Sequence, residues 1–162
     1  TEIYTLSLHD ALPIYTGRKL QPSWLKDLLA NGTKVRPYMF TRMPRFGEAN
    51  VGHLAAEFAE VDKAEPINHQ TDAFSDKMLK LTGRRLVGSK GFSCIKCHTF
   101  GNHKATGVQS LDMTQMTKRL QYDWFHKYVQ DPVALRPLTR MPSAWPNGQI
   151  LQIGRASCRE RV

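Results

Sequence analysis

The 162-residue chain has little cysteine, no long apolar run and a shortage of acidic residues. Its three cysteines are too few for a disulfide-held scaffold. Mean hydropathy is −0.44, and no apolar run approaches the roughly 18 residues of a membrane span, so none is predicted. Lys and Arg total 23 against 14 Asp and Glu, a net charge of +9, which predicts an acidic partner.

The two ends of the chain read unlike the rest. Residues 1–14 and 153–162 resemble translations of a sequencing adapter, one strand at each end, and we expect them to be assembly artefacts. Without them the net charge is still +9, and Cys158 drops out. A fragment cut at both ends would also lack its start, so a missing signal peptide carries no information.

An internal repeat with an offset of 100 residues sets the organisation. Residues 20–24 (LQPSW) match residues 120–124 (LQYDW). Two extra residues then enter the first copy, after which residues 41–44 and 139–142 both read Thr-Arg-Met-Pro. The matches include one Trp pair and one Met pair, so we expect duplicated architecture.

Each copy of the repeat is expected to begin with a short helix. Ser23 and Asp123 precede the two matching Trp residues and are predicted N-caps. Residues 31–32 (Asn-Gly) and 131–132 (Asp-Pro) are predicted to end these helices. We expect the two Trp residues to anchor the core.

Further helices are predicted over residues 49–61 and 73–87, the second with a basic end. Their apolar faces would consist of Val51, Leu54, Phe58 and Val61 in one and of Phe74, Met78 and Leu81 in the other. The polar residues 63–72 between them contain Pro and predict a linker. No alternating strand pattern is present, so the predicted fold class is all-α with long loops.

The chemical motif is Cys94-Ile95-Lys96-Cys97-His98, the C-x-x-C-H pattern of c-type haem attachment. Two thiols one helical turn apart can each add to a haem vinyl group, and the adjacent His98 then faces the iron. Met141 follows 43 residues later in a loop stiffened by Pro, and is the candidate for the second axial ligand.

In these segments the chain resembles the class I c-type cytochromes, and more closely cytochrome c modules of large bacterial secreted proteins. The resemblance rests on residues 83–107 (GRRLVGSKGFSCIKCHTFGNHKATG), 123–137 (DWFHKYVQDPVALRP) and 138–148 (LTRMPSAWPNG). It implies one covalently bound haem c, with thioethers to Cys94 and Cys97. It also implies axial ligation of the iron by His98 and Met141.

The resemblance implies two modules. Residues 73–152 would form a cytochrome c domain that lacks its C-terminal helix, the helix that an N-terminal helix over 73–87 would cross. Residues 15–62 would be the rear half of a truncated first domain. The offset of 100 places the first haem motif before residue 1, so Met43 would be a distal ligand that has lost its haem.

The residues also allow other interpretations of the cysteine pair. Cys94 and Cys97 could form half of a zinc site with His103 as a third ligand, or a thiol redox pair. No second cysteine pair and no βαβ pattern supports either. Between the two terminal segments, His53, His69, His103 and His126 are expected to be exposed or structural. Trp145 is a candidate wall of the haem pocket, and Arg42, Arg136 and Arg140 are candidate propionate partners.

Together these features predict a one-electron carrier rather than an enzyme, as a module of a larger redox protein. The resemblance implies a dehydrogenase activity in that parent protein, because such modules often accept electrons from a dehydrogenase domain on the same chain. We expect a periplasmic or cell-surface location and a redox partner protein with an acidic face. The alternatives are a dihaem peroxidase-like enzyme and a haem-based sensor, both of which need a displaceable distal ligand. Nucleic-acid binding is not expected, because no binding motif accompanies the positive charge.

Overall fold

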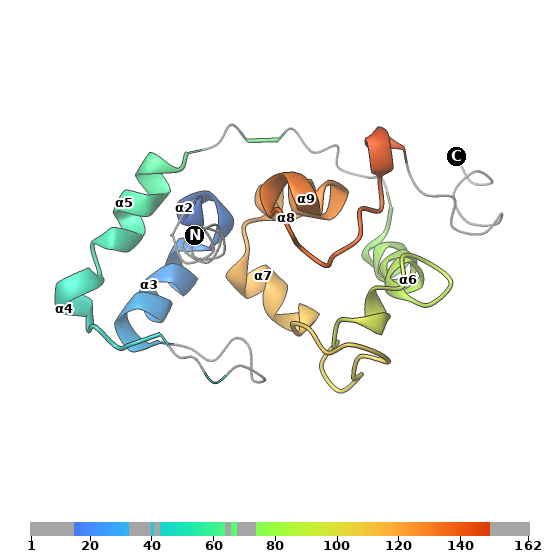
Figure 1. Cartoon of the computed structure of the whole chain (residues 1–162), viewed down its shortest axis with the longest axis horizontal. Helices are drawn as coiled ribbons and strands as arrows, with labels where there is room; N and C mark the ends of the chain where they lie inside the picture. Colours follow the sequence, from blue (N-terminus) through green and yellow to red (C-terminus); the bar gives the residue numbers. More distant parts are fainter. Residues whose placement is uncertain (1–14, 33–39, 41–42, 64–65, 68–73, 150–162) are drawn as a thin grey trace, which may run out of the picture. The chain divides into compact units, whose positions relative to one another are not determined.

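The structure is a computed structural model, which describes residues 15–32, 40, 43–63, 66–67 and 74–149. The terminal segments 1–14 and 153–162 lie outside the described residues, as do His69 and most of the predicted linker. Regular structure in the described part is helical (Figure 1), and strand pairing there is limited to three isolated bridges. The all-α prediction is therefore confirmed.

Contacts divide the chain into two units. Among the described residues, the first unit contains 15–32, 43–63 and 118–121, and the second contains 40, 66–67, 74–117 and 122–149. The α-helices are α2 (Thr16–Lys19), α3 (Pro22–Asn31), α4 (Glu48–Val51), α5 (Leu54–Val61), α6 (Asp76–Val87), α7 (Met116–Arg119), α8 (Tyr122–Gln130) and α9 (Pro132–Leu135). Single 3₁₀ turns are η1 (Cys94–Lys96), η2 (Met113–Gln115) and η3 (Pro146–Gly148).

The first unit holds the buried apolar core. In it α2 and α3 pack against α5, and α3 also contacts α4. Six buried apolar side chains lie here: Leu20, Leu25, Leu29, Ala30, Ala55 and Leu120, whereas the second unit buries Pro132. Gly17 allows the closest approach, because a Cβ at this position would lie 1.8 Å from the carbonyl oxygen of Phe58. The Gly17 N–H also donates to Asp62 Oδ2 at 2.7 Å.

The helix ends of the repeat follow the prediction, but the starts do not. α3 ends at Asn31, before Gly32 with φ 66°, and α8 ends at Gln130, directly before Asp131-Pro132. The N-cap predictions for Ser23 and Asp123 are wrong, because α3 begins at Pro22 and α8 at Tyr122. Pro is well suited to the first helical position, since its ring fixes a helical φ and needs no hydrogen-bond partner.

The helix predicted over residues 49–61 is instead two helices, α4 and α5, separated at Gly52 and His53. The residues that face the core also differ from the prediction. Ala55 is buried, whereas Val61, a predicted member of the apolar face, is 83% exposed. The single-helix prediction and the place of Val61 in its core face are therefore wrong.

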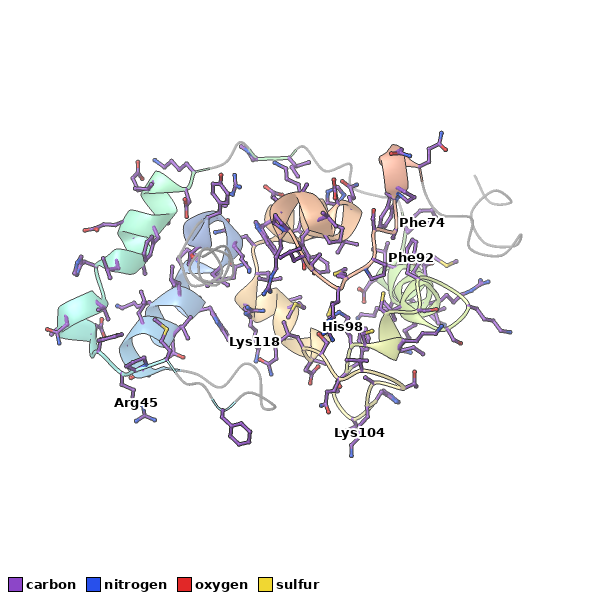
Figure 2. The ribbon with its side chains drawn as sticks, in the orientation of Figure 1. Arg45, Phe74, Phe92, His98, Lys104 and Lys118 are labelled. Atoms are coloured by element: carbon purple, nitrogen blue, oxygen red, sulfur yellow. The ribbon has the colours of Figure 1, made fainter. Side chains whose placement is uncertain are left out.

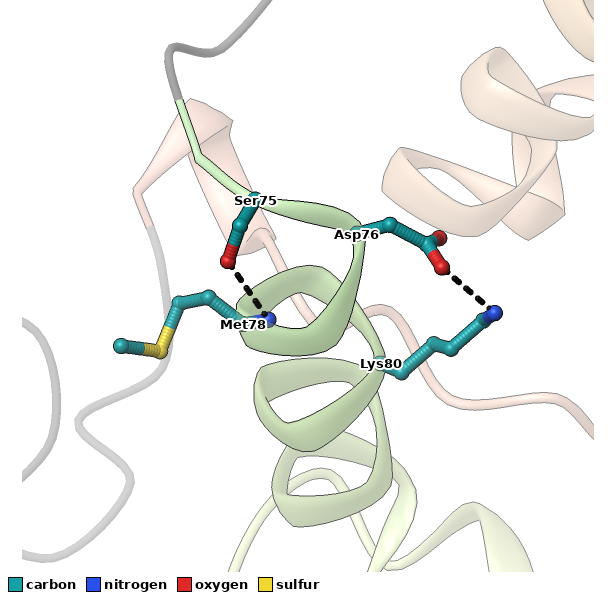
Figure 3. A network of polar contacts seen from close by, with 4 residues as sticks. All are labelled: Ser75, Asp76, Met78 and Lys80. Carbon is teal, nitrogen blue, oxygen red and sulfur yellow. Dashed lines mark hydrogen bonds and ion pairs between the residues drawn. The ribbon is translucent and has the colours of Figure 1, made fainter.

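α6 begins at Asp76, three residues later than predicted, and Ala73 lies outside the described residues. The Ser75 hydroxyl caps it by accepting from the Met78 N–H at 3.4 Å, and Lys80 pairs with Asp76 at 2.6 Å across one turn (Figure 3). The predicted basic end is confirmed by Arg84 and Arg85 in the last turn. The apolar stripe of Phe74, Met78 and Leu81 is exposed.

Candidate functional site

The two thiols and the histidine of the motif occupy a single helical turn in the second unit. Ser93 enters it with a left-handed φ of 58°, and η1 follows. The Cys97 N–H donates to the Cys94 carbonyl at 3.1 Å, and the His98 N–H donates to the same carbonyl at 2.8 Å. Cys94 is half-buried and Cys97 is exposed, and both are free thiols. The turn therefore brings the three predicted residues together.

The end of α6 positions this turn. The Phe92 N–H donates to the Leu86 carbonyl at 2.6 Å, which holds Phe92 beside the last turn of α6 (Figure 2). Gly91 is required at this junction, because a Cβ there would lie 2.2 Å from the Leu86 carbonyl oxygen. A residue with a side chain would push the thiol turn away from α6.

The His98 ring is fixed by a backbone carbonyl: its Nδ1 lies 3.0 Å from the oxygen of Leu111. A carbonyl oxygen can only accept, so Nδ1 carries the proton and donates it. In the neutral ring, Nε2 then keeps a free lone pair. Metal-ligating histidines typically make this kind of hydrogen bond through their second nitrogen, so the geometry suits an iron ligand.

The Leu111 carbonyl is held in place by the loop that returns to the thiol turn. The Met113 N–H donates to the Thr99 carbonyl at 2.8 Å, and the Ser110 N–H donates to the Cys97 carbonyl at 2.7 Å. Asp112 fastens the two sides of the loop.

Asp112 Oδ1 accepts from the Thr114 N–H at 2.9 Å, from the Thr114 hydroxyl at 2.8 Å and from the Gly101 N–H at 3.2 Å. The Thr114 N–H is the main reason that the pKa of Asp112 is lowered. The carboxylate is therefore the form that holds this loop together.

Met141 lies half-buried in a loop that two side chains fasten to α8. Thr139 Oγ1 accepts from the Met141 N–H at 3.3 Å and lies 3.2 Å from the Tyr128 hydroxyl. Beyond Met141, the Ser143 hydroxyl donates to the Gln130 carbonyl at 3.1 Å. Sequence reasoning assigned no role to Thr139, although its recurrence in both Thr-Arg-Met-Pro segments was a signal that could have found it.

An aromatic pair joins the segment before the thiols to the segment after Met141. The rings of Phe92 and Trp145 have centroids 4.9 Å apart and planes inclined by 42°. Both side chains belong to the second unit, as do His98 and Met141. The ring contact therefore links the two segments that contain His98 and Met141.

The geometry does not favour the other interpretations of the cysteine pair. No group of three or more His, Cys, Asp or Glu that could hold a metal exists among the described residues, and His103 is exposed in a tight turn with Phe100. Burial raises the pKa of the Cys94 thiol, and the neighbouring Cys97 adds to the shift. Reactive redox thiols have lowered pKa values, which is the opposite trend.

The remaining candidate residues are dispersed. Met43 is exposed and lies in the first unit. Arg42 lies outside the described residues, whereas Arg140 is exposed and Arg136 is half-buried. The first copy also lacks the anchor of the Met141 loop, because Leu28 stands at the position equivalent to Tyr128 and has no hydroxyl.

Comparisons of the chain with models of protein families, with curated proteins and with solved structures found no match. In the part of the chain that the structure describes, no helix has the length and apolar character needed to cross a bilayer.

Proposed function

We propose that the second unit is a class I cytochrome c-like domain that transfers single electrons through one covalently attached haem c. Cys94 and Cys97 would hold the group by thioether bonds, and His98 and Met141 would ligate its iron. When bound, the haem supplies a one-electron iron couple. The described thiols are free and adjacent to His98 on one turn, which is the donor set that this attachment requires.

The hydrogen bond from His98 Nδ1 to the Leu111 carbonyl is the observation that carries the proposal. It selects the tautomer whose Nε2 can ligate, and it restricts rotation of the ring. The bond also strengthens the ring nitrogen as an electron donor, which is one of the levers by which a protein sets a reduction potential. A histidine with a fixed tautomer and restricted ring rotation would suit an iron ligand that stays bound in both oxidation states.

The anchored Met141 loop favours a carrier over a peroxidase-like enzyme or a sensor. Both alternatives need a distal position that opens to a small ligand. Thr139 and Ser143 fasten the chain on either side of Met141, so a movement of this loop away from α8 would break hydrogen bonds. Ligation of the iron by a methionine sulfur and a histidine also raises the reduction potential relative to ligation by two nitrogens, which suits an electron carrier.

The surface charge supports a partner with an acidic docking face. Residues 74–111 contain seven Lys or Arg and a single acidic residue, Asp76. Lys104 projects from the loop that follows His98 (Figure 2), and Lys96 lies exposed between the two thiols. Such a surface would steer an acidic redox protein toward the haem edge. Covalent haem attachment takes place outside the cytoplasm, so the proposed location is periplasmic or at the cell surface.

The proposal is tested by producing the full chain in a host with c-haem maturation machinery and extracting it with acid. Haem that stays with the polypeptide in wild type, and is lost in Cys94→Ser/Cys97→Ser, would support it. Cys158→Ser serves as the matched control and should retain haem. A chain that carries no covalent haem would overturn the proposal.

A further inference from the structure

The two copies of the repeat meet at equivalent residues. Leu20 and Leu120 form an antiparallel bridge within the first unit, at the offset of 100 residues that relates the copies. The Gln21 N–H donates to the Arg119 carbonyl at 2.9 Å, and the Gln121 N–H donates to the Lys19 carbonyl at 2.9 Å. Exchanging the two copies therefore leaves the backbone pairing unchanged.

The side chains repeat the same symmetry. Gln21 Nε2 donates to the Leu120 carbonyl at 3.0 Å, and Gln121 Nε2 donates to the Leu20 carbonyl at 2.9 Å. Gln121 adds one bond, to the Gly17 carbonyl at 2.6 Å. Leu20 and Leu120 are 7% and 6% exposed, so both leucines are buried where the copies pair.

The helices around the bridge extend the repeat. α2 and α7 are both four-residue helices that end in two basic residues, and each leads through Leu-Gln into the longer helix that carries the repeated Trp. Each copy therefore presents the same donors, acceptors and leucine from the same local structure. A contact of this kind is isologous: the surface is complementary to itself.

We propose that the Leu-Gln segment between these helices is a docking site for another copy of the same repeat. In this chain the site of the first copy is filled in cis by Leu120 and Gln121. An isologous contact closes on two members, so it would join tandem copies in pairs rather than in an open array. If one segment in a chain is disabled, the other should accept the segment of a second chain. The proposal is independent of haem binding.

The pairing itself can be tested by a disulfide in the full chain. The backbone bonds flank Leu20 and Leu120, a non-hydrogen-bonded pair whose Cα atoms are about 4.5 Å apart in antiparallel strands. That separation suits a disulfide. Leu20→Cys/Leu120→Cys should form an intramolecular disulfide between these positions on mild oxidation, identified by peptide mass spectrometry. Lys26→Cys/Leu120→Cys, with one thiol on an exposed position of α3, is the control. New thiols that stay unpaired, or that pair with Cys94 or Cys97, would overturn the proposal.

Gln21→Pro tests self-complementarity. Gln21 has a φ of −59° and precedes α3, so Pro fits the backbone while removing both hydrogen bonds that Gln21 donates. Hydrogen exchange at the Gln121 amide should accelerate on the order of tenfold or more in monomeric protein. Sedimentation should reveal a concentration-dependent dimer.

Gln21→Pro/Gln121→Pro has no intact segment and should sediment as a monomer, and Gln115→Ala should behave as wild type. A Gln21→Pro chain that remains monomeric although its Gln121 amide is exposed would overturn the proposal. So would a dimer that persists in the double variant.

Discussion

The indole ring of Trp145 packs on the phenyl ring of Phe92, with centroids 4.9 Å apart. Phe92 lies two residues before Cys94, and Trp145 lies four residues after Met141. The pair therefore couples the segments that contain the two proposed iron ligands, His98 and Met141.

Trp145→Leu should loosen this coupling. An aromatic pair contributes about 0.5–1.5 kcal/mol beyond the area it buries, so the free energy of unfolding should fall by at least that amount. The measurement is guanidinium denaturation of the haem-loaded chain. Val108→Ala, at a side chain that is 66% exposed, should change the unfolding free energy little. Equal effects of the two substitutions would show that the ring contact does not stabilise the site.

The Thr139 hydroxyl should fix the Met141 loop to α8, because it bonds both the Met141 N–H and the Tyr128 hydroxyl. Thr139→Val and Tyr128→Phe each remove the hydrogen bond between the two side chains, so a double-mutant cycle should give a coupling of about 1 kcal/mol. Thr139→Val should also increase carbon monoxide binding to the haem-loaded protein, because the Met141 loop is less firmly held. Thr82→Val, at an exposed position of α6, is the control. Purely additive effects would contradict this role of Thr139.

Two glycines in the same local sequence should respond in opposite ways to alanine. Gly17 and Gly83 both stand between Thr and Arg. A Cβ at Gly17 would strike the Phe58 carbonyl, whereas a Cβ at Gly83 meets nothing within 4 Å. Gly17→Ala should destabilise the first unit by about 1–3 kcal/mol. Gly83→Ala should stabilise α6 by about 0.5–1 kcal/mol. Urea denaturation, monitored by hydrogen exchange in each unit, would measure both changes in the free energy of unfolding. A Gly17→Ala substitution without effect on the unfolding free energy would contradict the close packing of α2 on α5.

The two thiols should differ in reactivity when the chain is made without haem. Cys97 is exposed, whereas burial raises the pKa of the half-buried Cys94 thiol. A raised pKa leaves less thiolate at neutral pH, so iodoacetamide should modify Cys97 first and Cys94 more slowly. The rate at Cys94 should continue to rise as the pH increases above the usual range for thiols. Mass spectrometry of the modified peptides would show the order, and faster modification of Cys94 would contradict the structure.

Local sequence signals predicted helix ends better than helix starts. Asn31-Gly32 and Asp131-Pro132 stop the backbone whatever surrounds them, and both stops are observed. Ser23 is a good capping residue, but Pro22 starts α3, and Pro is favoured at the first helical position. Two local signals therefore competed there. The side-chain amide of Gln21 bonds the Leu120 carbonyl 99 residues away, and a contact so distant cannot be read from the residues around the helix.

The same limit applies to the candidate site. Cys94, Cys97 and His98 were found because their chemistry requires a fixed local spacing. Leu111 was not found, because it acts through its carbonyl oxygen and any residue type could supply that group. Thr139 is an intermediate case: the repeat marks the residue, but only the fold places it beside Tyr128.

The central claim is tested most directly by absorption spectra of the haem-loaded full chain and of Met141→Ala, each in the ferric and ferrous states, with Met43→Ala as control. The account predicts sharp low-spin bands in wild type and a ferric methionine–iron charge-transfer band. That band should be absent from Met141→Ala and unchanged in Met43→Ala. A high-spin wild-type spectrum, or a charge-transfer band that survives in Met141→Ala, would contradict electron transfer through a haem held by His98 and Met141.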